Sequence, residues 1–166
     1  VVGIDRSAQD AWTWRSHELR SAASSPTAVV PTDARPADGT AVQRGTTIVN
    51  DTIRSLPIDL ADLPPMFDGS GTITSASIAC PADGVTAIIL SRLIAGDTGR
   101  LVGTARAAGH PRDPIGGLAV AVAAALRDAD LTPDAIATWH LAERTAAGSL
   151  LACRCLTIFG VDPDRI

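Results

Sequence analysis

Apolar side chains at helical spacing form the first clear pattern in the chain. Over residues 7–23 they share one face of a predicted helix: Ala8, Ala11, Trp12, Leu19 and Ala22. Ser7 and Asp10 stand three residues apart, which is typical of the capping pair at the start of a helix. The sequence therefore predicts that the first helix begins at Ser7.

Residues 113–160 show the same spacing twice. Asp113 and Pro114 suit the N-cap and first position of a helix. Its apolar face would consist of Ile115, Leu118, Ala119, Val122 and Leu126. Residues 132–134 predict a short turn, residues 136–141 a strand, and helical spacing resumes near Thr145. This order predicts a helix, a strand and a helix.

The rest of the chain mixes short apolar runs with turn-forming residues. We expect strands at residues 28–30, 46–49, 85–90 and 101–105. Residues 58–63 predict a helical turn, which two prolines stop, and residues 68–71 predict a tight turn. Residues 72–79 are small and polar, so their backbone could closely approach a ligand or another subunit.

Length, charge and hydropathy narrow the class of protein. At 166 residues the chain fits one compact domain. All 14 basic residues are Arg, they are scattered, and the net charge is −4, which argues against a nucleic-acid surface. The longest apolar run, residues 118–126, is about half of the roughly 18 residues that a membrane span needs. We therefore expect neither nucleic acid nor a membrane as a partner.

Cysteine content and the first residues bear on the cellular compartment. The 3 cysteines lack the spacing of a disulfide framework. The first residues lack the charged lead and the long apolar core of a signal peptide. Both features favour a cytoplasmic location. The first residue is Val rather than Met, so we expect a fragment or a processed chain.

Three blocks, in order, resemble the thiolase superfamily. They are DRSAQDAWTWRSHELRSAA, LPPMFDGSGTITSASIACPADGVTAIILS and the Ala-rich helix followed by LTPDAIATWHLAERTAAGSL and FGVDPDRI. The resemblance implies an α/β fold with thiolase-like α/β/α layers, an incomplete second half and a mixed sheet. It also implies a loop-domain remnant and connection at residues 1–66 and a partial C-terminal thiolase-like domain at residues 67–166.

Thiolases form or cleave a carbon–carbon bond next to a coenzyme A thioester, with one Cys as acyl acceptor and another for the α-proton. In the family, the nucleophile, a Gly-His-Pro motif and the second Cys lie outside the three blocks. The family's Asn-Glu-Ala-Phe motif corresponds to residues 142–145, where Glu143 keeps its place, Ala142 replaces the water-orienting Asn and Thr145 replaces the Phe of the acyl pocket. Glu143 is a candidate catalytic residue or simply an acid favoured at a helix start.

The resemblance also indicates where coenzyme A would bind. Phe67 matches a Phe that lines the pantetheine, Ala79 replaces a Ser that touches its amide, and Arg54 lies near an Arg on the adenine side. Core packing is the alternative for Phe67, and a solvated surface charge is the alternative for Arg54. The coenzyme A thioester would be a substrate, with no permanently bound cofactor.

Histidines and cysteines supply the remaining candidates. His140 comes three residues before Glu143 and is a candidate acid–base group or a satisfied strand-end histidine. Residues 109–111 read Gly-His-Pro, but they precede the helix near Ile115, whereas the family's motif follows its Asn-Glu-Ala-Phe segment. They are interpreted as a turn before that helix, with a catalytic His110 as the alternative. Cys153 and Cys155 are interpreted as buried small side chains, and we predict no metal site.

These residues leave several functions open. One is an acyl-CoA C-acyltransferase acting on 3-ketoacyl-CoA thioesters, inactive as this chain alone. The substitutions at Ala79, Ala142 and Thr145 favour a second, a non-catalytic subunit for coenzyme A binding or assembly. A third is a thiolase-fold aldolase that acts with a partner protein. In each case we expect a homo-oligomer or a partner subunit, because the implied sheet is incomplete.

Overall fold

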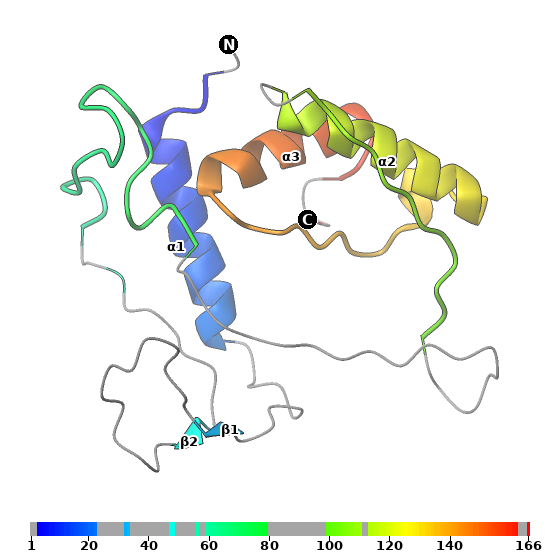
Figure 1. Ribbon diagram of the computed structural model, residues 1–166, viewed down its shortest axis with the longest axis horizontal. Helices are drawn as coiled ribbons and strands as arrows, with labels where there is room; N and C mark the ends of the chain where they lie inside the picture. The colour runs from blue at the N-terminus through cyan, green and yellow to red at the C-terminus, as the bar shows by residue number, and fades with distance from the viewer. Residues whose placement is uncertain are drawn as a thin grey trace.

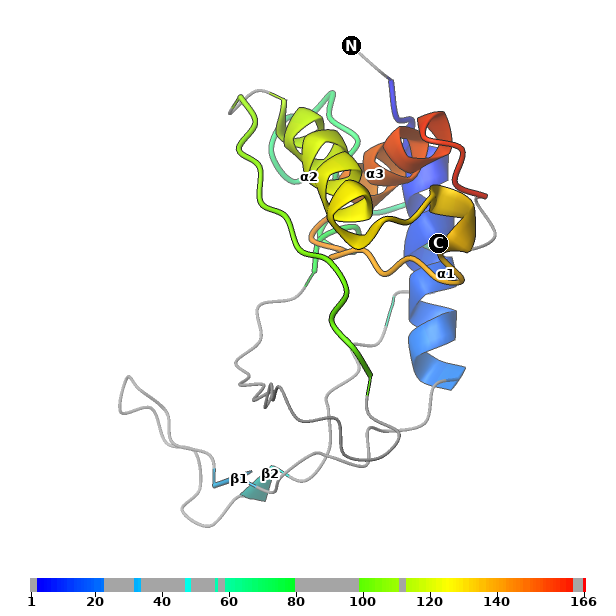
Figure 2. The same cartoon turned by 90° about the vertical axis from the view of Figure 1, so that its right-hand side faces the viewer.

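A computed structural model describes residues 3–22, 32–33, 47–48, 56, 59–79, 99–110, 113–162 and 166. Three α-helices dominate these residues: α1 (Arg6–Ala22), α2 (Pro114–Ala129) and α3 (Ala146–Ile158). Figures 1 and 2 show α3 lying between α1 and α2. All three predicted helices are therefore confirmed.

The start of α1 differs from its prediction. The Asp5 carboxylate accepts hydrogen bonds from the Ala8 N–H at 2.7 Å and from the Ser7 hydroxyl at 2.9 Å. These two bonds, the first being the stronger effect, lower the pKa of Asp5. The predicted pair of Ser7 and Asp10 is thus wrong, because Asp5 takes the capping position and Asp10 pairs with Arg6.

The other two helices begin where the sequence predicts, and both starts are capped by a side chain. Asp113 accepts a hydrogen bond from the Gly116 N–H at 3.0 Å, and Thr145 accepts one from the Gly148 N–H at 3.0 Å. Between them, the predicted turn is the short 3-10 helix η1 (Pro133–Ala135). In the part of the chain that the structure describes, no helix combines the length and apolar character needed to cross a membrane.

Strand pairing in the described residues is sparse. It consists of β1 (Thr32–Asp33) paired antiparallel with β2 (Thr47–Ile48), and of an isolated bridge between Ile78 and Thr145. β2 falls within the strand predicted at residues 46–49. Residues 28–30 and 85–90 lie outside the described residues, so the layered sheet stays a prediction.

Two predicted strands are wrong. Residues 101–105 and 136–141 contain no strand. The first segment packs along α2 instead: the Thr104 N–H donates to the Asp128 carboxylate at 3.1 Å. A Cβ on Gly103 would lie 2.6 Å from the Ala125 carbonyl oxygen, so the backbone of this segment touches the helix directly. Contact with a helix has replaced contact with a neighbouring strand.

The core lies where α3 meets its neighbours. Helix α3 contacts both α1 and α2. Leu156 of α3 is 1% exposed, and Leu60 and Val161 are 2% and 3% exposed. With few aromatic residues in the chain, these aliphatic side chains and small residues such as Ala146 and Ala152 supply the packing.

Candidate functional site

Two segments far apart in the sequence meet at the start of α3. The Ala146 N–H donates to the Ser77 carbonyl at 2.9 Å, and the Ala79 N–H donates to the Arg144 carbonyl at 3.0 Å. Ile78 and Thr145 form the antiparallel bridge between them. We call this pairing of residues 77–79 with residues 144–146 the seam.

Thr145 explains why the seam forms at this position. Its backbone is extended, with φ −145° and ψ 147°, as both an N-cap and a strand-like pairing require. The same residue therefore pairs with Ile78 and starts α3 with its side chain. The start of α3 and the pairing with residues 77–79 therefore depend on the same residue.

A tight turn holds the other side of the seam. The Ser77 hydroxyl accepts a hydrogen bond from the Thr74 N–H at 3.0 Å and donates one to the Thr74 carbonyl at 3.1 Å. Thr74 and Ser77 are 0% and 4% exposed, and Ala76 between them is also buried. The small residues predicted to permit close approach therefore approach the start of α3.

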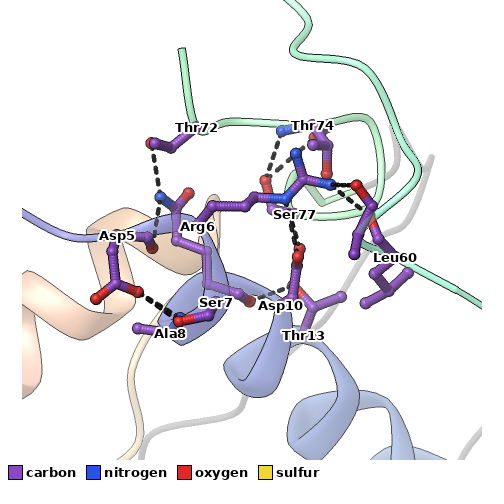
Figure 3. A network of polar contacts seen from close by, with 12 residues as sticks. Asp5, Arg6, Ser7, Ala8, Asp10, Thr13, Leu60, Thr72, Thr74 and Ser77 are labelled. Carbon is purple, nitrogen blue, oxygen red and sulfur yellow. Dashed lines mark hydrogen bonds and ion pairs between the residues drawn. The ribbon is translucent and has the colours of Figure 1, made fainter. Parts of the chain in front are cut away.

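Helix α1 anchors the segment that leads into this turn (Figure 3). Gln9, which is 0% exposed, donates through Nε2 to the Thr72 hydroxyl at 2.8 Å. Arg6 donates to both carboxylate oxygens of Asp10, at 2.8 and 3.0 Å, and to the carbonyl of Leu60. Arg6 thus holds the backbone of residues 59–79 at Leu60, and Gln9 holds the Thr72 side chain.

Glu143 lies beside α1. Its Oε2 accepts a hydrogen bond from the Ser16 hydroxyl at 2.5 Å, across 127 positions of sequence. Cys153 of α3 lies close enough to feel the charges of both Arg15 and Glu143. The exposed Glu143 side chain therefore reaches α1 at the surface of the molecule.

The structure brings together two of the predicted site residues. Ala79 bonds to Arg144, the residue next to Glu143, so Ala79 and Glu143 both belong to the seam or its edge. His140 is exposed. Phe67 is 76% exposed, which is inconsistent with the core-packing alternative for this residue. Arg54 lies outside the described residues, and the ligand-contacting and catalytic roles all stay predictions.

Neither described thiol is poised as a nucleophile. Burial is the main cause that raises the pKa of both Cys153 and Cys155. The attacking species is the thiolate, which a raised pKa makes scarce near neutral pH. Cys155 is buried and Cys153 half-buried, in agreement with their interpretation as packing residues. Within the described ranges, no group of three or more His, Cys, Asp and Glu residues could hold a metal ion.

Several residues of the site could not be singled out from the sequence. Ser16 and Gln9 occupy positions with no local signal of a distant partner, and Ser77 was predicted only as part of the small, polar segment 72–79. Arg6 and Asp10 do carry a local signal, because opposite charges four residues apart face each other on a helix. That spacing predicts their ion pair, although not the bond from Arg6 to Leu60.

Comparison with known proteins decides the family. Residues 1–93, more than half of the chain, match the family model described as the thiolase N-terminal domain. The chain belongs to the thiolase family. The predicted resemblance is thereby confirmed, while the division into parts at residues 66 and 67 stays a prediction.

A curated thiolase-family relative supports the assignment over part of the chain. Acetyl-CoA acetyltransferase erg10A, mitochondrial, of Aspergillus fumigatus is 36% identical over 118 residues, which cover 63% of this chain and 27% of the relative. The thiolase chain described here thus spans little more than a quarter of that protein. The relative's name places it in mitochondria, and the cytoplasmic location expected for this chain stays a prediction.

Proposed function

We propose that this thiolase-family chain takes part in acyl-CoA C-acyl transfer on 3-ketoacyl-CoA thioesters, and that by itself it binds coenzyme A or acyl-CoA without turning it over. The observation that carries the proposal is the match of residues 1–93 to the thiolase N-terminal domain. The relative named acetyl-CoA acetyltransferase supports the reaction class. The seam is the proposed contact for the thioester, because it joins Ala79 to the segment with Glu143.

The side chains near the seam support binding more than catalysis. Ala142 has no donor where the family's Asn orients a water, and loss of one such donor lowers a rate by roughly a hundred- to a thousandfold. Burial keeps the described thiols protonated. Glu143 is engaged with Ser16. We therefore propose that coenzyme A chemistry by this chain needs further groups.

Direct binding tests the first part of the proposal. Isothermal titration of the chain with coenzyme A should give measurable heat at millimolar ligand. Ala79→Ser would restore the hydroxyl that the family uses on the pantetheine amide, and a new hydrogen bond of about 0.5–1.5 kcal/mol would tighten Kd roughly 2- to 10-fold. Ala107→Ser, at an exposed position of the 99–110 segment, is the matched control and should change nothing. Absence of heat, or equal tightening by both variants, would contradict the seam as the binding site.

Turnover tests the second part. The chain mixed with acetoacetyl-CoA and free coenzyme A should leave the absorbance of the 3-ketoacyl thioester unchanged, because no described group is an activated nucleophile. A full-length thiolase under the same conditions serves as the positive control. Steady loss of absorbance with this chain alone would refute the proposed inactivity.

A role as an assembly subunit is the second candidate. Large apolar side chains are exposed on several elements: Ile158 at 86%, Leu101 at 64% and Val120 at 62%. Exposed apolar surface of this kind favours association with a second copy or a partner subunit. Binding of coenzyme A without turnover fits both candidates, and only the acyl-transfer proposal requires the ligand to bind at the seam.

A further inference from the structure

The contact between Ser16 and Glu143 joins two parts of the chain that the family assignment separates. Ser16 lies in α1, within the residues that match the thiolase N-terminal domain, and Glu143 lies 50 residues beyond the end of that match at residue 93. Glu143 adjoins the seam, because it directly precedes Arg144, whose carbonyl accepts the Ala79 N–H. A bond at this position can therefore fix the backbone on one side of the seam.

We propose that Glu143 is a positioning residue held by Ser16, which fixes residues 142–145 for coenzyme A binding at the seam, and that its carboxylate is not the acid–base group of the site. The proposal rests on the function proposed above. It assigns Ser16 a role that depends on its hydroxyl and not on packing.

Geometry carries the proposal. The hydroxyl-to-carboxylate bond measures 2.5 Å, which is at the short end for an ionised acceptor. Its direction aims the carboxylate at α1, whereas the Ala79 N–H bonds to the backbone of the next residue. A carboxylate that accepts a hydrogen bond from a serine of α1 can hold its own segment in place.

The neighbouring contacts explain why one bond could matter. Residues 136–143 form neither helix nor strand. At their start, the Ile136 N–H donates to the Pro133 carbonyl of η1. Residues 144–146 are then fixed by the seam and by the cap of α3. Glu143 stands at the boundary, so its side chain adds a tie just before the seam begins.

Amide exchange measured by NMR on the intact chain tests the proposal without any ligand. Ser16→Ala and Glu143→Ala should each speed exchange of the Ala79 amide by roughly 3- to 10-fold, the effect of losing about one hydrogen bond. Glu143→Gln keeps an acceptor for the serine and should leave the exchange rate within about twofold. The double variant Ser16→Ala with Glu143→Ala should be no faster than either single variant, because both remove the same bond.

Titration with coenzyme A on the same variants provides the functional readout. The two alanine variants should weaken Kd by a similar factor, and Glu143→Gln should not. Unchanged Ala79 exchange in Ser16→Ala, additive effects in the double variant, or a Glu143→Gln variant as impaired as Glu143→Ala would each overturn the proposal. Failure of the unsubstituted chain to bind coenzyme A would instead refute the proposed function, since the exchange experiment stands independently of the ligand.

Discussion

Replacing Leu156 with Ala is expected to lower the free energy of unfolding by about 2–5 kcal/mol, the usual cost of truncating a fully buried leucine. Leu156 is 1% exposed and sits on α3, the helix that contacts both α1 and α2. Its backbone carbonyl also accepts hydrogen bonds from the N–H groups of Phe159 and Val161, which end the helix. Loss of the side chain would remove apolar contacts and leave a cavity in the core.

Urea denaturation followed by far-ultraviolet circular dichroism measures this effect. Ile158→Ala is the matched control, because Ile158 belongs to the same helix but is 86% exposed. We expect that variant to stay within about 0.5 kcal/mol of the parent. Equal destabilisation by the two substitutions would mean that α3 is not packed as described.

The helices could be predicted from sequence because their signals are local. Helical spacing and the caps Asp113 and Thr145 depend on residues within one or two turns, and two of the three predicted starts are confirmed. The start of α1 was misplaced because Asp5 and Ser7 are both good capping residues. Which of them caps depends on where the chain enters the helix, and spacing alone does not specify that.

The strand predictions failed for a nonlocal reason. An apolar run such as residues 101–105 satisfies a strand or an extended segment packed on a helix equally well. Gly103 decided between them, since its missing side chain permits backbone contact with α2. Nothing near Gly103 in the sequence indicates that α2 would be its neighbour.

The residues at and around the seam were predictable only in part. Resemblance to a family singled out Ala79 and Glu143, and the structure places them on the two segments joined by the Ala79–Arg144 bond. Ser16, Gln9 and Ser77 are missing from that prediction because hydroxyl and amide side chains are common at solvated positions. The partner of Gln9 lies 63 positions away and that of Ser16 lies 127 positions away, separations that no local pattern encodes.

Removing the Arg6 guanidinium should have the second largest effect. Arg6→Met would leave the Asp10 carboxylate without its cation and would remove one of the two donors to the Leu60 carbonyl, the other being the Leu63 N–H at 3.2 Å. The Asp10 side chain is only 14% exposed and Leu60 is 2% exposed, so water can replace the lost bonds poorly. We expect a loss of about 2–3 kcal/mol in the free energy of unfolding, because hydrogen bonds to charged groups contribute about 1.5–3 kcal/mol and the pair is not fully buried.

The double variant Arg6→Met with Asp10→Leu separates the two parts of that loss. It removes the orphaned carboxylate and should recover part of the stability, because an apolar pair of similar volume often matches a buried ion pair. The bond to Leu60 stays broken in both variants, so residues 59–79, which carry Phe67 and Ala79, should remain less firmly held. Denaturation in urea gives the stability, and coenzyme A titration gives the consequence for binding. If the double variant regains full stability and full affinity, Arg6 holds Asp10 alone, and the anchoring of residues 59–79 must come from Gln9 and Thr72 instead.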